Sequence, residues 1–311
     1  MKIYKNEIEG KNILATYDKL VAAWGCDVKE YDVSTDYGTT HVIEWGDEKA
    51  KPLILFHGVG DDSALMWLFN AKYLGQHYHL YAIDTLGGPG KSRPNENYNK
   101  NFDDIRWIDQ VLDGLNIEKA FFAGVSNGGY LTQYYTLNRP EKVLKGICIS
   151  ISVPSGKRKG LIPPLFKVFL PEALFPTVKN VEKLIKKLCG KNYDVFTDNK
   201  LIMAHYKSLL RGFNNMAMTY HKVRNFSEQE INSIRDKVVY LVGEEDPFQK
   251  LGGREALLEN RMEVFFYPDA GHGLNHELAD EINKKIVEHL AMYFNSTYKL
   301  CTKENCVNIF F

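Results

Sequence analysis

Short apolar runs of the kind that form buried strands recur along the chain, separated by stretches with helical spacing. Such alternation is typical of a mostly parallel sheet with helices on both faces. Residues 28–34 and 40–45 are expected to form an antiparallel pair that leads into the sheet. The strands predicted after them are residues 53–56, 80–83, 120–123, 143–151, 238–242 and 264–267. We therefore expect an α/β protein with an eight-stranded sheet.

The spacing of apolar residues predicts the helices between these strands. Ile13, Tyr17, Leu20, Val21 and Trp24 mark an amphipathic helix near the N-terminus. The further helical patterns occupy residues 63–74, 103–115, 127–138, 249–259 and 277–294.

One interval is far longer than a crossover between parallel strands needs. It lies between the strand predicted to end near 151 and the strand predicted to start at 238, and it carries several prolines and amphipathic helical patterns. We expect a discontinuous core domain of residues 1–152 and 236–311. Residues 153–235 are expected to form a helical cap inserted into that core.

The stretch from Gly124 to Gly128 lies between a predicted buried strand and a predicted helix. This context places Ser126 on a tight turn, with its hydroxyl exposed above the sheet edge and a helix N-terminus behind it. The flanking glycines are needed because side chains there would collide with the strand and the helix. The pattern is short enough to occur by chance, so a nucleophilic Ser126 also requires a base, an acid and an oxyanion hole.

Candidates for the base and the acid follow the last two predicted strands. A serine hydroxyl needs an imidazole to take its proton, and His272, flanked by two glycines, follows the final strand. Asp246 follows the preceding strand and is the best acid candidate to orient that imidazole. Glu244 and Glu245 are rivals on the same loop, closer to the strand end.

An oxyanion hole needs two convergent backbone N–H groups. Asn127, directly after the nucleophile and at a helix start, is expected to supply one. Val59, in the loop after residues 53–56, is expected to supply the second, with Gly60 as the alternative. His57 in the same loop is expected to be structural, packing and hydrogen-bonding beneath it.

Five motifs in chain order together resemble the α/β-hydrolase superfamily. They are Phe56-His57-Gly58, Ile83-Asp84 leading into Gly88-Pro89-Gly90-Lys91-Ser92, Gly124-Val125-Ser126-Asn127-Gly128-Gly129, Gly243-Glu244-Glu245-Asp246-Pro247 and Asp269-Ala270-Gly271-His272. The resemblance runs from about residue 27 to 294, and it is closest to bacterial carboxylesterases with a helical cap. It implies that Ser126, Asp246 and His272 form a catalytic triad. It also implies ester hydrolysis through an acyl-enzyme, without metal or organic cofactor.

These observations predict a serine hydrolase, a carboxylesterase acting on small-to-medium uncharged esters. Aromatic and methionine side chains of the cap are expected mainly to form its own core, with some lining an apolar pocket over Ser126. They are Phe166, Phe169, Phe175, Met203, Phe213, Met216 and Met218. Other activities of the same triad are alternatives: thioesterase, C–C bond hydrolase, peptidase or perhydrolase. A ligand sensor with little turnover is an alternative of a different class.

Three other features are expected to carry no chemistry. Residues 88–92 resemble the end of a P-loop, but Thr85 stands where the first glycine would be, so nucleotide binding is not expected. Cys301 and Cys306 have no further cysteine or histidine close by in sequence, so a metal site is not expected there. Asp84 is expected to be a structural loop residue rather than a catalytic acid.

Composition excludes several partners. Among 311 residues, 39 Lys and Arg balance 39 Asp and Glu, so no overall field favours nucleic acid or an anionic membrane. Five scattered cysteines argue against a disulfide framework and fit a reducing compartment. The first residues lack the apolar core of a signal peptide, and no run reaches transmembrane length. We expect a cytoplasmic protein that acts on a small ester. The tail, residues 295–311, is too weakly patterned to predict an element.

Overall fold

The computed structural model describes residues 1–156 and 175–301, and from residue 293 onward only the helical backbone. Its centre is a nine-stranded sheet in the order β1-β2-β4-β3-β6-β7-β8-β9, with β5 paired to β2. The strands are β1 (Lys29–Thr35), β2 (Gly38–Trp45), β3 (Pro52–Phe56), β4 (His79–Ile83), β5 (Arg93–Pro94), β6 (Ala120–Val125), β7 (Val143–Ile149), β8 (Val238–Gly243) and β9 (Glu263–Tyr267).

The direction of the strands follows the predicted pattern. β1, β2 and β4 pair in antiparallel fashion, and every pair from β4 to β9 is parallel. The predicted α/β class with a mostly parallel sheet is confirmed. The short strand β5 is an addition that the hydrophobic pattern does not predict, because two residues carry no periodicity.

Helices surround this sheet, and two predicted helices are divided. The patterns at 63–74 and 249–259 each form two shorter helices, the second pair separated by Gly252, whose φ is +93°. The helices are α1 (Glu7–Ala23), α2 (Ser63–Met66), α3 (Ala71–Leu74), α4 (Asp104–Gly114), α5 (Asn127–Asn138), α7 (Val178–Leu188), α8 (Asp194–Thr197), α9 (Lys200–Gly212), η1 (Asn215–Met218), α10 (Glu228–Ile234), η2 (Arg235–Lys237), η3 (Gln249–Leu251), α11 (Gly253–Glu259), α12 (Leu274–Glu277) and α13 (Ala279–Cys301). Among the described residues, no helix is long and apolar enough to cross a membrane.

The central strands direct alternate side chains into two hydrophobic layers. Leu53 and Leu55 of β3 enter a layer shared with α1, α2, α3 and α13, whereas Ile54 and Phe56 enter a layer shared with α4, α5 and α10. Both faces of the sheet are therefore covered by helices, which explains why its parallel strands are rich in apolar residues.

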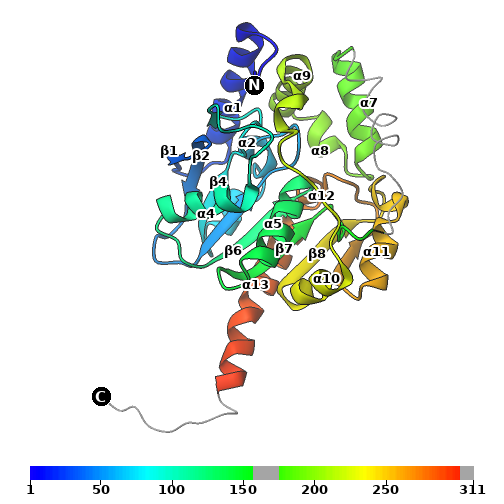
Figure 1. The fold of residues 1–311 in the computed structure, drawn as a ribbon. Coiled ribbons are helices and arrows are strands. Elements are labelled where there is room, and N and C mark those ends of the chain that lie inside the picture. Colours follow the sequence, from blue (N-terminus) through cyan, green and yellow to red (C-terminus); the bar gives the residue numbers. More distant parts are fainter. Residues whose placement is uncertain (157–174, 302–311) are drawn as a thin grey trace.

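The helices between β7 and β8 pack in two different regions of the molecule. α7, α8 and α9 lie beyond one end of the sheet, where α9 packs against α1 (Figure 1). Val181 and Phe196 from these helices join the first hydrophobic layer, so they are continuous with the core. α10 packs against α5 instead. Phe166 and Phe169 of the predicted cap lie outside the described residues.

Asp84, directly after β4, connects three loops at the carboxyl edge of the sheet. Its buried carboxylate accepts hydrogen bonds from the Tyr17 hydroxyl at 2.9 Å, the Ser63 N–H at 3.0 Å and the Lys91 N–H at 2.7 Å. These partners belong to α1, the start of α2 and the loop before β5. Both carboxylate oxygens are engaged, as expected for the structural role predicted for Asp84.

Replacing Asp84 with alanine should destabilise the fold strongly. The substitution leaves three donors without their acceptor, at least two of them in the interior, and each such group costs about 1–3 kcal/mol. We expect Asp84→Ala to lower the free energy of unfolding by at least about 3 kcal/mol in urea denaturation. The exposed Asp236→Ala is the matched control, with a change within about 0.5 kcal/mol. Equal stability of the two variants would contradict the structural role of Asp84.

Candidate active site

Ser126 occupies a strained turn between β6 and α5. Its backbone has φ 53° and ψ −117°, a conformation that residues with a Cβ rarely adopt. Two glycines allow the turn to be this tight. A Cβ on Gly124 would lie 2.1 Å from the Gly128 carbonyl oxygen, and one on Gly128 would lie 2.3 Å from the Phe56 carbonyl oxygen. The side chain of Ser126 is partly exposed, so the turn presents its hydroxyl at the surface of the sheet edge.

His272 and Asp246 are in direct contact. His272 Nδ1 lies 2.8 Å from Asp246 Oδ2, and the other carboxylate oxygen accepts the Phe248 N–H at 2.8 Å. Asp246 is fully buried, whereas the His272 side chain is 18% exposed. The Phe248 ring stands edge-on to the imidazole, with the ring centroids 4.8 Å apart. The imidazole is therefore fixed on one side and accessible on the other.

The two rival carboxylates face other partners. Glu244 Oε1 accepts a hydrogen bond from Arg254 Nη1 at 2.8 Å, and Glu245 Oε2 lies 3.1 Å from Lys250 Nζ. Both glutamate side chains are exposed. Of the three acids on this loop, Asp246 is the one whose carboxylate contacts His272.

The sheet topology brings Ser126, Asp246 and His272 to the same edge. They follow β6, β8 and β9, which belong to one parallel set. The carboxyl ends of parallel strands meet at one edge, where ligands of α/β proteins bind. Within the described residues, no hydrogen bond joins the Ser126 hydroxyl to His272. Such bonds are often long in ligand-free enzymes and shorten when substrate binds.

Both predicted oxyanion donors lie next to Ser126. Asn127 is the first residue of α5, so its N–H has no acceptor within the helix. Across the turn, a Cβ on Gly58 would lie 3.4 Å from Ser126 Cβ, which places the loop of Val59 beside the serine. In the described part of the chain, the Val59 N–H donates no backbone hydrogen bond. Its neighbour Gly60, the alternative donor, has φ +76°.

His57 is buried beneath this loop and hydrogen-bonds to it. Its Nδ1 lies 2.8 Å from the Gly58 carbonyl oxygen, and its Nε2 accepts the Thr85 N–H at 2.9 Å. Burial lowers the pKa of His57 below its ordinary value, so the ring stays neutral. With both ring nitrogens engaged, His57 has the structural position that the sequence predicts.

The environment of His272 favours the charged imidazole. Burial opposes protonation, but the charge and hydrogen bond of Asp246 outweigh it, helped by the charge of Glu277, and together they raise the pKa of His272. Among the described residues, no group of three His, Cys, Asp or Glu side chains is placed to hold a metal ion.

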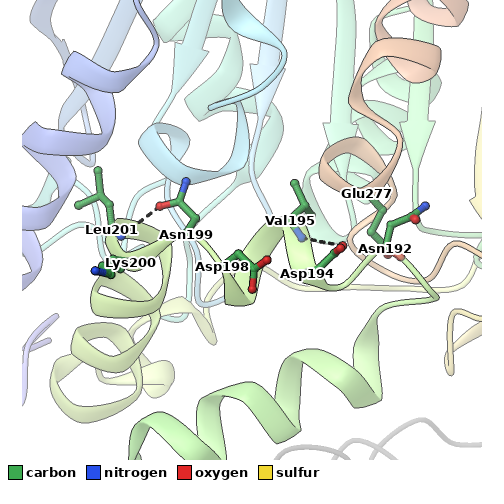
Figure 2. A pocket seen from close by; sticks show the side chains of 8 residues that line it. All are labelled: Asn192, Asp194, Val195, Asp198, Asn199, Lys200, Leu201 and Glu277. Atoms are coloured by element: carbon green, nitrogen blue, oxygen red, sulfur yellow. Dashed lines mark hydrogen bonds between the residues drawn. The ribbon is translucent and has the colours of Figure 1, made fainter.

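An open depression lies next to this edge, where α8 and α9 meet. It has a volume of about 790 Å³, and most of the residues that line it are polar: Asn192, Asp194, Val195, Asp198, Asn199, Lys200, Leu201 and Glu277 (Figure 2). Ser126, Asp246 and His272 are not among its lining residues, so we do not assign it to the substrate. Of the predicted cap residues, Met203, Phe213 and Met218 are buried, whereas Phe175 and Met216 are exposed.

Two residues beside His272 are not predicted from the sequence. Phe248 stands against the imidazole, and Glu277 accepts the Gly271 N–H at 2.9 Å. Phe248 follows the Asp246 motif by two positions, which could have marked it as a neighbour. Glu277 is the first residue of the helix predicted at 277–294, and no local pattern distinguishes it from a solvated residue.

Comparison with known proteins agrees with this architecture. A family profile described as alpha/beta hydrolase fold matches residues 51–171. Carboxylesterase YbfK of Bacillus subtilis (strain 168) is 27% identical over 287 residues, covering 90% of this chain and 94% of that protein. The crystal structure of a naproxen esterase from Bacillus subtilis has a TM-score of 0.75 at 25% identity, covering 92% of this chain and 99% of that one. This chain therefore has the α/β-hydrolase fold and, over most of its length, resembles bacterial carboxylesterases.

Proposed function

We propose that this protein is a serine esterase in which Ser126 is the nucleophile, His272 the general base and Asp246 the acid that orients it. The main support is the contact between His272 and Asp246 at the sheet edge that also presents the strained Ser126. The likeness to carboxylesterases supports an ester as the substrate.

The reaction follows from the chemistry of these groups. His272 Nε2 takes the proton of the Ser126 hydroxyl as the oxygen attacks the ester carbonyl carbon. Asp246 holds the Nδ1–H, which keeps the correct tautomer and stabilises the imidazolium. The alcohol leaves with the proton from Nε2, and an acyl-enzyme remains on Ser126. Water, activated by the same imidazole, then releases the acid and restores the serine.

The negative charge that forms on the carbonyl oxygen needs donors that are already in place. We assign this role to the N–H groups of Val59 and Asn127, one from each side of Ser126. The start of α5 adds the positive end of its helix dipole at this point. Donors fixed before the reaction stabilise the transition state more than the uncharged substrate.

The substrate class is a small-to-medium uncharged ester. Val59, in the loop beside Ser126, and Met216 of η1 both expose apolar side chains. Asn215 Oδ1 of η1 would lie 3.2 Å from a Cβ on Gly60, so η1 is next to the Val59 loop. An apolar rim of this kind suits an uncharged acyl or alcohol group. We propose that residues 153–235 act as a cap over this edge, through α7, α8, α9 and η1.

Substitution of the three residues should remove ester hydrolysis to different extents. Ser126→Ala should abolish turnover of a short-chain p-nitrophenyl ester, and His272→Ala should be nearly as damaging because the two act as a unit. Asp246→Asn should lower kcat by about 10⁴-fold, because the imidazole loses its orienting carboxylate. The matched control is Glu245→Gln on the same loop, which should retain wild-type activity.

The pattern of losses identifies the acid. Near-normal turnover by Asp246→Asn with a large loss in Glu245→Gln or Glu244→Gln would move the acid role to that glutamate. Turnover that persists in Ser126→Ala would exclude the serine mechanism. A folded wild type without turnover would favour the sensor alternative or a specialised substrate.

The pH dependence of kcat/KM should have an acid limb above the ordinary imidazole value of about 6.5. His272 must be neutral to act as a base, and because its pKa is raised, it becomes protonated at a higher pH than an ordinary imidazole. The measurement is kcat/KM between pH 4 and 9. Asp61, on the loop after Val59, must be tested as well, because burial raises its pKa to about 7. An acid limb that vanishes in Asp61→Asn would assign the titration to Asp61 instead of His272.

A further inference from the structure

Helix α12, which follows the His272 loop, is tied to the end of α2 by two side chains. The Asn275 amide donates to the Met66 carbonyl oxygen at 2.7 Å, and His276 Nε2 lies 2.9 Å from the Leu65 carbonyl oxygen. Burial lowers the pKa of His276 to about 4, so this ring is neutral and donates that bond. The helix is therefore a fixed support rather than a surface turn.

The third side chain, Glu277, bridges two other segments. Its Oε1 accepts the Gly271 N–H at 2.9 Å, and its Oε2 accepts the Gly190 N–H at 2.7 Å. Gly271 directly precedes His272, and Gly190 lies between α7 and α8. The side chain is nearly buried, with Glu277 7% exposed. Figure 2 shows Glu277 next to Asn192, where the chain passes from α7 toward α8.

Residues 188–191, which we call the strap, run along the His272 loop. The His272 N–H donates to the Leu188 carbonyl oxygen at 2.7 Å, and the Lys191 N–H donates to the Asp269 carbonyl oxygen at 2.7 Å. Lys191 Nζ also lies 2.7 Å from Asp269 Oδ1. The strap therefore holds the backbone of the histidine itself.

The two segments touch backbone to backbone. A Cβ on Gly190 would lie 1.9 Å from the Asp269 carbonyl oxygen, and one on Gly271 would lie 2.3 Å from the Leu188 carbonyl oxygen. Because the backbones themselves are in contact at these two glycines, we expect the strap and the His272 loop to move together.

We propose that Glu277 is a positioning residue for His272: by accepting one N–H from the His272 loop and one from the strap, it fixes the imidazole and makes its position depend on the end of α7. The inference rests on the proposed function in so far as His272 is the base. It also extends that function, because it makes the inserted segment a part of the catalytic geometry.

The charged groups that face the imidazole are Asp246 and Glu277, and both favour its protonated form. Glu277 itself faces the two N–H groups, the Cys189 thiol and the more distant Asp246. Burial raises the pKa of Glu277, while the Gly271 and Gly190 N–H groups favour its charged form. Loss of this carboxylate should therefore change both the position and the titration of His272.

The test compares three variants of the full chain. Glu277→Gln keeps the size but loses the charge and one acceptor, whereas Glu277→Asp keeps the charge but is one methylene too short to bridge both N–H groups. Glu281→Gln, exposed on α13, is the matched control. The measurements are kcat and KM with a p-nitrophenyl ester, thermal unfolding, and the titration of His272 by NMR of ¹⁵N-histidine-labelled protein, assigned with His272→Gln.

We expect Glu277→Gln to lower kcat by up to about 100-fold with KM changed less than about threefold, because the base is misplaced while the substrate site remains. The His272 titration should move to lower pH in this variant. Glu277→Asp should lower kcat by about 10-fold with a near-wild-type titration of His272. This variant distinguishes the effect of side-chain length from the effect of the negative charge. Glu281→Gln should match the wild type in every measurement.

One result would overturn the proposal: wild-type kcat together with a wild-type His272 titration in Glu277→Gln. If the unfolding temperature is lowered at the same time, Glu277 has a purely structural role. The NMR titration needs no substrate, so it tests whether Glu277 acts on His272 even if the wild type hydrolyses no ester. Should Glu277→Gln fail to fold, Glu277→Asp decides it, and wild-type kcat in that folded variant would also overturn the proposal.

Discussion

The architecture of the candidate site depends on one close approach between backbones. The first turn of α5 packs against the ends of β3 and β6 so tightly that neither Gly124 nor Gly128 has room for a Cβ. This contact forces Ser126 into a positive-φ turn, which costs of order 1–3 kcal/mol that the surrounding packing must offset. As a result, Ser126, the Asn127 N–H at the start of α5 and the Val59 loop lie close together.

Buried polar groups hold the remaining loops around that region. Asp84 is hydrogen-bonded to α1, α2 and the loop before β5, and His57 is hydrogen-bonded to the loop of Val59. Asp62 adds a contact between the loop after β3 and α9, because its carboxylate lies 2.8 Å from His205 Nε2. A hydrogen-bonded interior group of this kind is costly to separate from its partner, so these loops behave as fixed parts of the sheet edge.

The sequence predicted most of the fold because parallel strands leave a strong signal. The parallel strands were expected from apolar runs, and the two strands that lead into the sheet were expected as an antiparallel pair. The chain order of motifs placed Ser126, Asp246 and His272 at strand ends. Local breaks were missed, such as the left-handed Gly252, because periodicity does not report a single φ angle. The contacts of Glu277 were missed for another reason: neither backbone N–H that it accepts leaves a sequence pattern, and one of them, from Gly190, belongs to a distant part of the chain.

The strap has a consequence for how this architecture can diversify. An insertion joined to a core only by its two ends can be exchanged as a cassette, with each part keeping its own properties. Here residues 188–191, which belong to the proposed cap, are hydrogen-bonded along the loop of His272, so the proposed cap contacts the rest of the chain at more than its two ends. A chimera that imports a foreign helical segment would preserve the histidine geometry only by retaining residues 188–191 together with Glu277. In such a chimera, residues 188–191 and the His272 loop would have to be exchanged together.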